Sequence, residues 1–321
     1  MNNSATSLAS QNIWAAIPTP FQAPNLELDE QGLRHNVRRY ISVGLRGVFC
    51  NGLMGEVWAL TNQERRRVVE VLVDEAAGRL GVSAVITASS LQETCELGLH
   101  AKKAGAEHAV LLAPTSGPRS DEQLIAYFRH IANYVDMPMV IFNSATAAGS
   151  PLTPTVFKEL CEIPQLRLLK STAYETNVAL RDAACNGVIV SDPLEEHFFD
   201  SYVKYQQRVL YADPEPYLYQ GPGNTPINSY IEMLDKGAVA EASIEFEKLS
   251  LHRAAFNKWV MDPLKTGHMP CAALKYWCDL IGLVGGPVRR PLAELTESQR
   301  HELKNDLISC SMPGLDLIET A

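Results

Sequence analysis

The chain has 321 residues, of which 46% are hydrophobic and 20% are charged, so it can bury a large core and is typical of a globular protein. Its formal net charge of −9 argues against a nucleic-acid partner, which would need clustered lysine and arginine. Residues 1–11 are small and polar, and no apolar run approaches the roughly 18 residues of a membrane helix. We expect a cytoplasmic protein with no signal peptide and no membrane partner.

Cysteine and histidine spacing indicates neither a disulfide framework nor a metal site. The seven cysteines are odd in number and contain no CxxC pair, a pattern that fits reduced, mostly buried thiols. The eight histidines show no HExxH motif and no paired ligand spacing. A GxSxG nucleophile motif and a GxxxxGK phosphate loop are also missing from the sequence. We therefore expect no metal ion in the active site.

Short apolar runs alternate with longer segments of helical period from about residue 14 to residue 213, which is the pattern of repeated strand–helix units around a parallel sheet. The runs are Trp14–Phe21, Gly47–Gly52, Ser83–Ser90, Ala109–Thr115, Met139–Asn143, Leu166–Thr172, Gly187–Asp192 and Val209–Asp213. Eight is the number that a closed barrel requires, so the sequence predicts an α/β fold, a (β/α)8 TIM barrel. Tyr217–Gln220 competes with Val209–Asp213 for the place of the eighth strand.

Helix signals separate these runs; Thr61 with Glu64 three residues later, for example, has the pattern of a capping box. After residue 213 the chain becomes rich in proline and glycine. It then continues into three helical stretches, near 238–262, 270–285 and 297–310. We predict a barrel at 12–236 and C-terminal helices at 237–321 that pack on the barrel or on a neighbouring subunit.

Polar residues at the predicted strand ends are candidates for an active site, because barrel sites lie at the carboxyl ends of the strands. Lys170 ends the sixth strand, where burial would strip water from its amine and favour the neutral, nucleophilic form that Schiff-base chemistry needs. The alternative is that Lys170 extends to solvent. Asp192 and Asp213 end the seventh and eighth strands, where they either bind substrate hydroxyls or amines, or cap the following helices.

The turn after the second strand holds two glycines three residues apart, Gly52 and Gly55. Such a turn exposes backbone amides toward a ligand, so the amides of Leu53 and Met54 are candidates to receive a carboxylate. The alternative is that the glycines only shape the turn. We interpret Glu56, which follows, as a residue that holds the loop rather than as a general base.

Several motifs occur in the order and spacing of a known family. They are Ile17–Pro18–Thr19–Pro20–Phe21, Gly52–Leu53–Met54–Gly55–Glu56 with Leu60–Thr61 and Glu64–Arg65, Phe142–Asn143, Leu169–Lys170 and Val288–Arg289–Arg290–Pro291–Leu292. Over most of its length the chain resembles the dihydrodipicolinate synthase/N-acetylneuraminate lyase family of class I aldolases. The resemblance implies a (β/α)8 barrel with C-terminal helices, a homotetramer, and a Schiff base between Lys170 and a 2-oxo acid. No cofactor is expected, because a lysine imine is itself the electron sink.

The chain also departs from the family's usual pattern. The substituted positions are Leu53, Met54, Thr115, Ser116, Phe142 and Ala147. The first two lack hydroxyls that help to bind the substrate carboxylate, and the next three stand where the family commonly has tyrosines. The alanine stands where dihydrodipicolinate synthases hold an arginine for a second carboxylate. We therefore do not expect dihydrodipicolinate synthase activity.

Loss of the tyrosine at Phe142 leaves proton transfer to another group. A positioned acid or base typically contributes ~10²–10⁴-fold to the rate. The candidates are Tyr174, four residues past the lysine, Thr115 or Ser116, and water. Tyr174 has a competing role as an ordinary residue at the start of a helix.

Our first hypothesis is a cofactor-independent Schiff-base lyase, of aldolase or dehydratase type, with a small 2-oxo acid or aldehyde as its partner. Because Leu53, Met54 and Phe142 make the pocket more apolar than usual, we expect a 2-oxo acid with an apolar portion. Two alternatives stay open. One is a catalytically weak barrel that binds an oxo acid as a sensor or a partner subunit, and the other is an imine-dependent decarboxylase or condensing enzyme of specialised metabolism.

Overall fold

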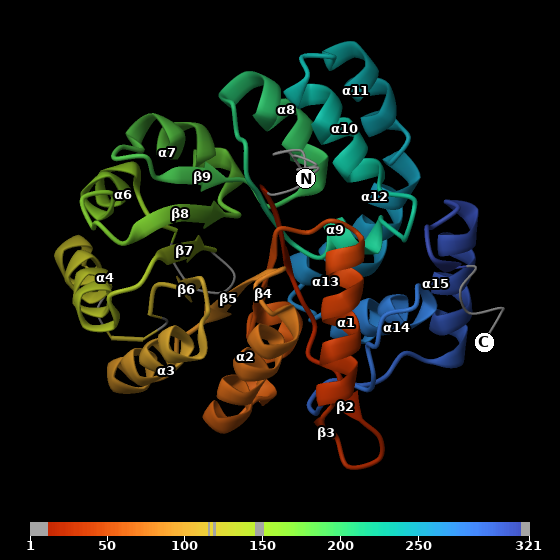
Figure 1. The fold of residues 1–321 in the computed structure, drawn as a ribbon, viewed down its shortest axis with the longest axis horizontal. Helices are drawn as coiled ribbons and strands as arrows, with labels where there is room; N and C mark the ends of the chain where they lie inside the picture. Colours follow the sequence, from red (N-terminus) through yellow and green to blue (C-terminus); the bar gives the residue numbers. More distant parts are fainter. Residues whose placement is uncertain (1–11, 115, 118–119, 145–150, 316–321) are drawn as a thin grey trace, which may run out of the picture.

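The computed structural model describes residues 12–114, 116–117, 120–144 and 151–315. Its centre is a sheet of eight parallel strands in the order β10-β1-β4-β5-β6-β7-β8-β9, curled into a nearly closed barrel (Figure 1). The barrel strands are β1 (Ile13–Ala16), β4 (Gly47–Cys50), β5 (Gly81–Val85), β6 (His108–Leu111), β7 (Met139–Asn143), β8 (Leu166–Ser171), β9 (Ile189–Ser191) and β10 (Leu210–Ala212). Each predicted run overlaps one of these strands, so the predicted (β/α)8 barrel is confirmed.

Helices that follow the strands cover the outside of the barrel (Figure 1). They are α1 (Glu30–Ser42), α2 (Asn62–Ala76), α3 (Leu91–Ala104), α4 (Asp121–Val135), α6 (Pro154–Leu160), α7 (Asn177–Ala183) and α8 (Glu195–Tyr205). The predicted capping box starts α2: the Thr61 side chain accepts a hydrogen bond from the Glu64 N–H, and the Glu64 carboxylate accepts one from the Thr61 N–H.

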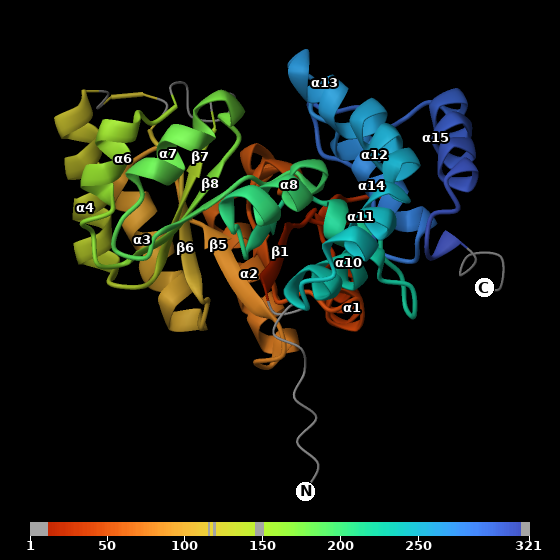
Figure 2. The same cartoon turned by 90° about the horizontal axis from the view of Figure 1, so that it is seen from above.

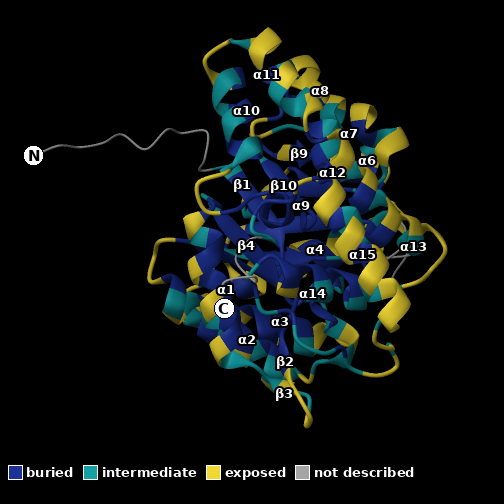
Figure 3. Ribbon diagram, turned by 90° about the vertical axis from the view of Figure 1, so that its right-hand side faces the viewer, coloured by how far each residue is buried: buried dark blue, intermediate teal, exposed yellow. Residues whose placement is uncertain are grey.

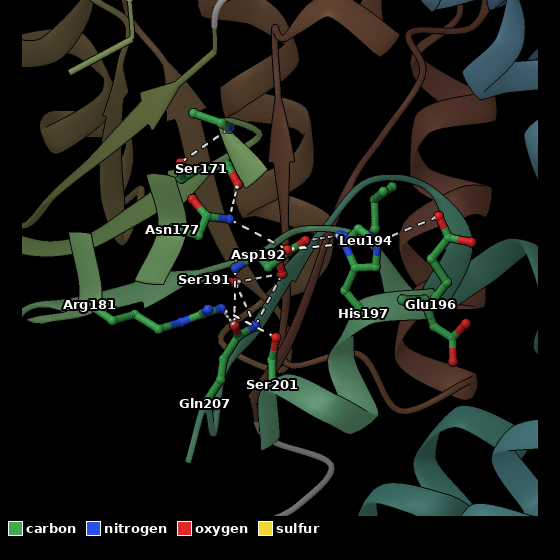
Figure 4. Close-up of polar contacts among 12 residues, drawn as sticks. Ser171, Asn177, Arg181, Ser191, Asp192, Leu194, Glu196, His197, Ser201 and Gln207 are labelled. Atoms are coloured by element: carbon green, nitrogen blue, oxygen red, sulfur yellow. Dashed lines mark hydrogen bonds and ion pairs between the residues drawn. The ribbon is translucent and has the colours of Figure 1, made fainter. Parts of the chain in front are cut away.

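Side chains take a large part in closing the barrel between β9 and β10, with Gln207 and Ser191 side by side at the junction (Figure 4). Among the described residues no backbone ladder joins these two strands. Gln207 is 3% exposed, and its Nε2 donates to the carbonyl oxygens of Asp192 at 3.1 Å and Val209 at 3.0 Å. Ser191 Oγ lies 3.1 Å from the same Val209 oxygen and accepts from the Tyr211 N–H at 3.0 Å. The two side chains thus satisfy backbone groups that a ladder would otherwise pair.

The first predicted run divides in two. β1 ends at Ala16, and the end of the run forms β2 (Phe21–Gln22), which pairs antiparallel with β3 (Glu27–Leu28). Pro18 and Pro20 lie between β1 and β2 and lack the N–H that a ladder needs. The barrel strand is therefore shorter than predicted.

The eighth strand lies in Val209–Asp213, which contains β10. The competing segment, Tyr217–Gln220, lies partly in α9 (Glu215–Leu218) and partly in the turn after it. Tyr217 is buried there, and its hydroxyl donates to the Ala16 carbonyl oxygen at 2.8 Å. This helix therefore packs against the end of β1.

The C-terminal helices stand to one side of the barrel (Figure 2). They are α10 (Pro226–Asp235), α11 (Val239–Glu247), α12 (Ser250–Phe256), α13 (Asp262–Lys265), α14 (Cys271–Leu280) and α15 (Glu297–Ser309), with a π-helical turn at Asn257–Met261. Asn36 on α1 donates from Nδ2 to the Val284 carbonyl and accepts from the Val284 N–H, both at 2.8 Å. Because buried residues continue from the barrel into these helices (Figure 3), the boundary between 236 and 237 stays a prediction.

We expect Gln207→Ala to lower the free energy of unfolding by about 2–3 kcal/mol, because it leaves buried backbone groups without partners. Chemical denaturation measures this change. Gln123→Ala, at an exposed position on α4, is the matched control and should cost less than about 0.5 kcal/mol. Equal losses for the two variants would contradict the role of Gln207 in closing the barrel.

Candidate active site

Lys170 lies at the carboxyl end of β8, inside the mouth of the barrel. Its side chain is 1% exposed, and its Nζ lies 2.6 Å from Oδ1 of Asp213. Asp213 directly follows β10, so the two strands that flank β9 supply the two members of the pair. Because so little water reaches this salt bridge, each charge depends on the other for its stability.

Two aromatic rings enclose the Lys170 amine. Its Nζ lies 4.4 Å from the ring centroid of Phe49 and 4.5 Å from that of Phe142. Phe142 on β7 is the register partner of Lys170 on β8, which places the ring beside the amine. Phe49 comes from β4, and no motif in the sequence singles it out. Both rings attract a cation through their faces, but neither offers a proton.

A cavity of about 200 Å³ opens at the amine, and most of its wall is apolar. From the predicted site residues it brings together Lys170, Leu53, Met54, Phe142, Tyr174 and Asp213. Helix α13 and the π-helical turn before it add residues that the sequence reasoning missed, Met261, Leu264 and Lys265. The active-site wall therefore draws on both predicted parts of the chain.

A second cavity, of about 260 Å³, adjoins the first and shares Leu53 and Phe142 with it. The rest of its wall comes largely from the carboxyl ends of β5 and β6 and the segments that follow them. This part of the wall includes Leu112 and Ser116. Every described side chain in this wall is uncharged. The structure thus places Ser116 beside the second cavity rather than at the amine. Outside the described residues lie Thr115 and Ala147.

Glu56 holds the glycine-bounded turn beside the amine. The turn is a 3-10 helix at Leu53–Gly55, and Glu56 follows it with a φ of 55°. The Glu56 carboxylate is fully buried, lies 2.5 Å from Lys275 Nζ on α14, and accepts from the Arg289 N–H at 2.9 Å. Burial lowers the pKa of Lys275, and the charge on Glu56 opposes that change. Glu56 therefore ties the turn to the C-terminal helices, which is the structural role that we favour from the sequence.

Asp192 is engaged at the start of α8 rather than at the Lys170 amine (Figure 4). Its Oδ1 accepts from the Leu194 N–H at 3.1 Å, and its Oδ2 lies 3.1 Å from Nδ1 of His197 and 3.5 Å from Nδ2 of Asn177. The hydrogen bond to Asp192 raises the pKa of His197. These contacts hold the segment that joins β9 to α8. Asp192 does not cap α8 itself, whose N-cap is Leu194 with no side-chain cap, and the described cavity wall at the amine does not include Asp192.

Tyr174 reaches the cavity from the turn that follows β8. Its ring packs edge-to-face against His197, with centroids 5.1 Å apart and planes at 81°. Tyr174 is 36% exposed, and its partial burial, followed by the charges of Asp213 and Asp192, raises its pKa. Because such a phenol holds its proton more firmly, this environment weakens the case for Tyr174 as a proton-transfer group.

In the described part of the chain, the cysteines form no disulfide and the metal-ligating side chains form no cluster that could hold a metal ion. All seven cysteines are free, and six of them are buried. No group of three or more His, Cys, Asp or Glu side chains in the described ranges is arranged to hold a metal ion. Over the same ranges, no helix combines the length and apolar character needed to cross a membrane.

A (β/α)8 barrel with a lysine buried at the carboxyl end of one strand is an arrangement suited to the lyases of the class I aldolase type, which form a Schiff base on such a lysine. The model of the Dihydrodipicolinate synthetase family matches residues 9–197. The chain belongs to this family, and it is a lyase of that type.

Individual relatives resemble the chain over nearly its whole length. The 4-hydroxy-tetrahydrodipicolinate synthase of Methanopyrus kandleri is 28% identical over 305 residues, which cover 92% of this chain and 95% of the relative. The synthase of the same name from Thermus thermophilus is 37% identical over 161 residues, or 50% of this chain and 53% of the relative.

Solved structures show the same fold. Dihydrodipicolinate synthase from Aquifex aeolicus matches with a TM-score of 0.80 at 19% identity, over 94% of this chain and 99% of that one. A sialic acid aldolase from Ruminococcus gnavus, a catalytic lysine mutant, matches with a TM-score of 0.77 at 18% identity, over 95% of this chain and 97% of that one. At these identities the likeness establishes the fold alone.

We expect Lys275→Met to lower the free energy of unfolding by about 3–5 kcal/mol, because it leaves the buried charge of Glu56 unpaired. Thermal and chemical denaturation measure the loss. The chain that carries Lys275→Met together with Glu56→Gln should recover part of it, since no unpaired charge is left. A double variant as unstable as the single one would show that the ion pair is not the cause.

Proposed function

We propose that the chain is a cofactor-independent lyase, of aldolase or dehydratase type, in which Lys170 forms a Schiff base with a 2-oxo acid. The observation that carries the proposal is the Lys170 amine, buried at the barrel mouth and facing a cavity of about 200 Å³. An imine turns the former carbonyl carbon into an electron sink, so cleavage of a nearby bond needs no organic cofactor. The catalytic lysine of the similar sialic acid aldolase supports a lysine-based reaction.

We propose that the substrate has an apolar portion. Leu53, Met54 and Phe142 carry no hydroxyl, and the adjoining cavity adds about 260 Å³ of space walled by uncharged described side chains. Burial of apolar surface contributes about 25 cal/mol per Å². An alkyl or aryl tail therefore gains free energy by packing against Val85, Leu112 and Phe142. The hydroxyl side chains in the same wall are those of Thr87, Ser89 and Ser116.

The carboxylate of the substrate needs N–H donors or a cation nearby. We propose the backbone amides of Leu53 and Met54 for this role, because the first N–H groups of a helical turn have no acceptor within the turn. Lys265 also lines the cavity, and its side chain is 67% exposed, which places a second positive charge toward solvent.

The names of the relatives favour a different activity, 4-hydroxy-tetrahydrodipicolinate synthesis. An identity of 28% leaves the specificity of this chain open. The pocket supports another reaction, because Phe142 beside the amine has no hydroxyl with which to move a proton. Efficient 4-hydroxy-tetrahydrodipicolinate synthesis by the purified chain would overturn this part of the proposal.

A second candidate is a sensor or partner subunit that binds an oxo acid with little catalysis. Its support is the Lys170–Asp213 ion pair, since a charged ammonium is not a nucleophile. An imine-dependent decarboxylase or condensing enzyme shares the first step with the lyase and differs only afterwards.

We also propose that the chain assembles as a homotetramer and acts in the cytoplasm. Exposed apolar side chains on the C-terminal helices, among them Ile244 and Ile308, support contacts between subunits. Light scattering of the purified chain measures the assembly state, and a monomer would contradict the tetramer.

We expect borohydride to trap pyruvate or a larger 2-oxo acid on Lys170, because hydride reduces an imine to a stable amine. Peptide mass spectrometry locates the adduct. Lys170→Ala should lose both adduct and turnover, whereas Lys236→Ala, 72% exposed at the end of α10, should keep both. Reversible binding without an adduct would favour the sensor, and an adduct on another lysine would contradict the role of Lys170.

We expect alkyl and aryl 2-oxo acids to exceed sialic acid and sugar acids in kcat/KM by about tenfold or more, through burial of the tail. A steady-state substrate panel measures the ratio. Leu112→Asn, which adds a polar group to the second cavity, should narrow the ratio, and Leu91→Asn, 42% exposed on α3, should leave it unchanged. A clear preference for the sugar acids would overturn the apolar substrate.

A further inference from the structure

Asp213 supplies a carboxylate 2.6 Å from the Lys170 amine, in the wall of the same cavity. Imine formation needs a group that takes a proton from the amine and later gives one to the departing oxygen. Phe142, the register partner of Lys170, has no proton to exchange. We propose that Asp213 is the general acid–base catalyst of imine formation in this chain. The role rests on the proposed Schiff-base function and adds the residue that moves its protons.

The barrel itself fixes the position of this carboxylate. Asp213 follows β10 directly, and its N–H donates to the Pro193 carbonyl oxygen at 3.3 Å, across the junction between β9 and β10. Its side chain is 11% exposed, which limits competition from water. A group held on strand ends in this way keeps a constant distance to the reacting nitrogen, as acid–base catalysis requires.

Asp213 is the carboxylate that contacts the Lys170 amine, at 2.6 Å. The titratable and charged groups around the pair are Tyr174, Glu215 and Tyr217 near Asp213, and Lys265 in the cavity wall. Burial, followed by the charge of Asp213, raises the pKa of Glu215 well above its usual range, which favours the neutral form of this neighbour. Burial raises the pKa of both tyrosines as well, so they are also neutral.

The first half of the reaction takes two protons from the nitrogen, one of which ends on the substrate oxygen and the other on Asp213. The Asp213 carboxylate takes a proton from the Lys170 ammonium, and the freed lone pair on Nζ attacks C2 of the oxo acid. The electron pair of the C=O bond moves onto oxygen as the C–N bond forms. Asp213 then protonates that oxygen and accepts the second proton from the nitrogen, which gives a neutral carbinolamine and a protonated Asp213.

The second half releases water. Asp213 gives its proton to the carbinolamine hydroxyl, the C–O bond breaks with its electron pair on the leaving water, and the nitrogen lone pair forms the C=N bond. One ammonium and one carbonyl have become one iminium and one water, with no net proton taken up. The iminium has the same single positive charge as the ammonium, so the carboxylate of Asp213 pairs with a cation both before and after the reaction.

Asp213→Asn tests the role, because the amide keeps the shape of the side chain but cannot exchange protons in this way. We expect borohydride trapping of pyruvate on Lys170 to slow by ~10²–10⁴-fold, with the adduct still on Lys170. Asp200→Asn, whose parent side chain is 64% exposed on α8, is the matched control and should trap at the rate of the unchanged chain.

Asp213→Ala separates proton transfer from mechanical support. Added formate or acetate should restore part of the trapping rate, and the restored rate should depend on the pKa of the added acid. A carboxylate that only held the lysine in place would show no such dependence. Thermal unfolding checks each variant, and if Asp213→Ala does not fold, Asp213→Glu should still trap within about tenfold of the unchanged rate because it keeps the acid.

The outcomes are distinguishable. If the unchanged chain forms no adduct with any 2-oxo acid, the Schiff-base function fails and the role of Asp213 falls with it. If the unchanged chain forms the adduct and Asp213→Asn forms it equally fast, only the role of Asp213 is overturned. Slowed trapping in Asp213→Asn together with acid-dependent rescue in Asp213→Ala supports both the Schiff-base function and the role of Asp213.

Discussion

An ammonium buried in an apolar barrel is stable only beside an opposite charge, and the contact between Lys170 and Asp213 meets this constraint. The aromatic faces of Phe49 and Phe142 add further stabilisation of the cation while they exclude water. The same contacts also stabilise the charged ammonium, which must lose a proton before its nitrogen can act as a nucleophile. In our account one side chain, Asp213, both stabilises the ammonium and accepts its proton.

The closure of the barrel explains why two similar aspartates have different surroundings. Gln207 bridges the backbone of the chain on either side of the junction between β9 and β10, and Asp192 is fixed there by Leu194 and His197. Asp213 follows the other strand of the junction and turns its carboxylate to Lys170. The Asp192 carboxylate therefore binds the neighbouring backbone and His197, whereas the Asp213 carboxylate pairs with the Lys170 amine.

Much of the fold is predictable because it depends on local patterns. The eight strands follow from apolar runs at regular spacing, and the start of α2 follows from Thr61 and Glu64 alone. Lys170 was identifiable because a charged residue at the end of a buried strand is unusual. The short first strand was less predictable, since the effect of Pro18 and Pro20 depends on whether a ladder passes through them.

The candidate site was predictable only in part. Asp192 and Asp213 each follow a short strand and precede a proline, so no local pattern tells which of them reaches the amine. Met261, Leu264 and Phe49 look like ordinary core residues in the sequence, because their place at the cavity is set by packing between distant segments. Such contacts depend on tertiary structure, which periodicity and spacing do not describe.

The most direct measurement of the central claim is a crystal structure of the chain after borohydride trapping with an aryl 2-oxo acid. We expect a single bond from Lys170 Nζ to C2 of the acid, the Asp213 carboxylate within hydrogen-bond distance of that nitrogen, and the aryl group beside Leu53 and Phe142. A bond to a different lysine, or an Asp213 side chain turned away from the nitrogen, would contradict the account.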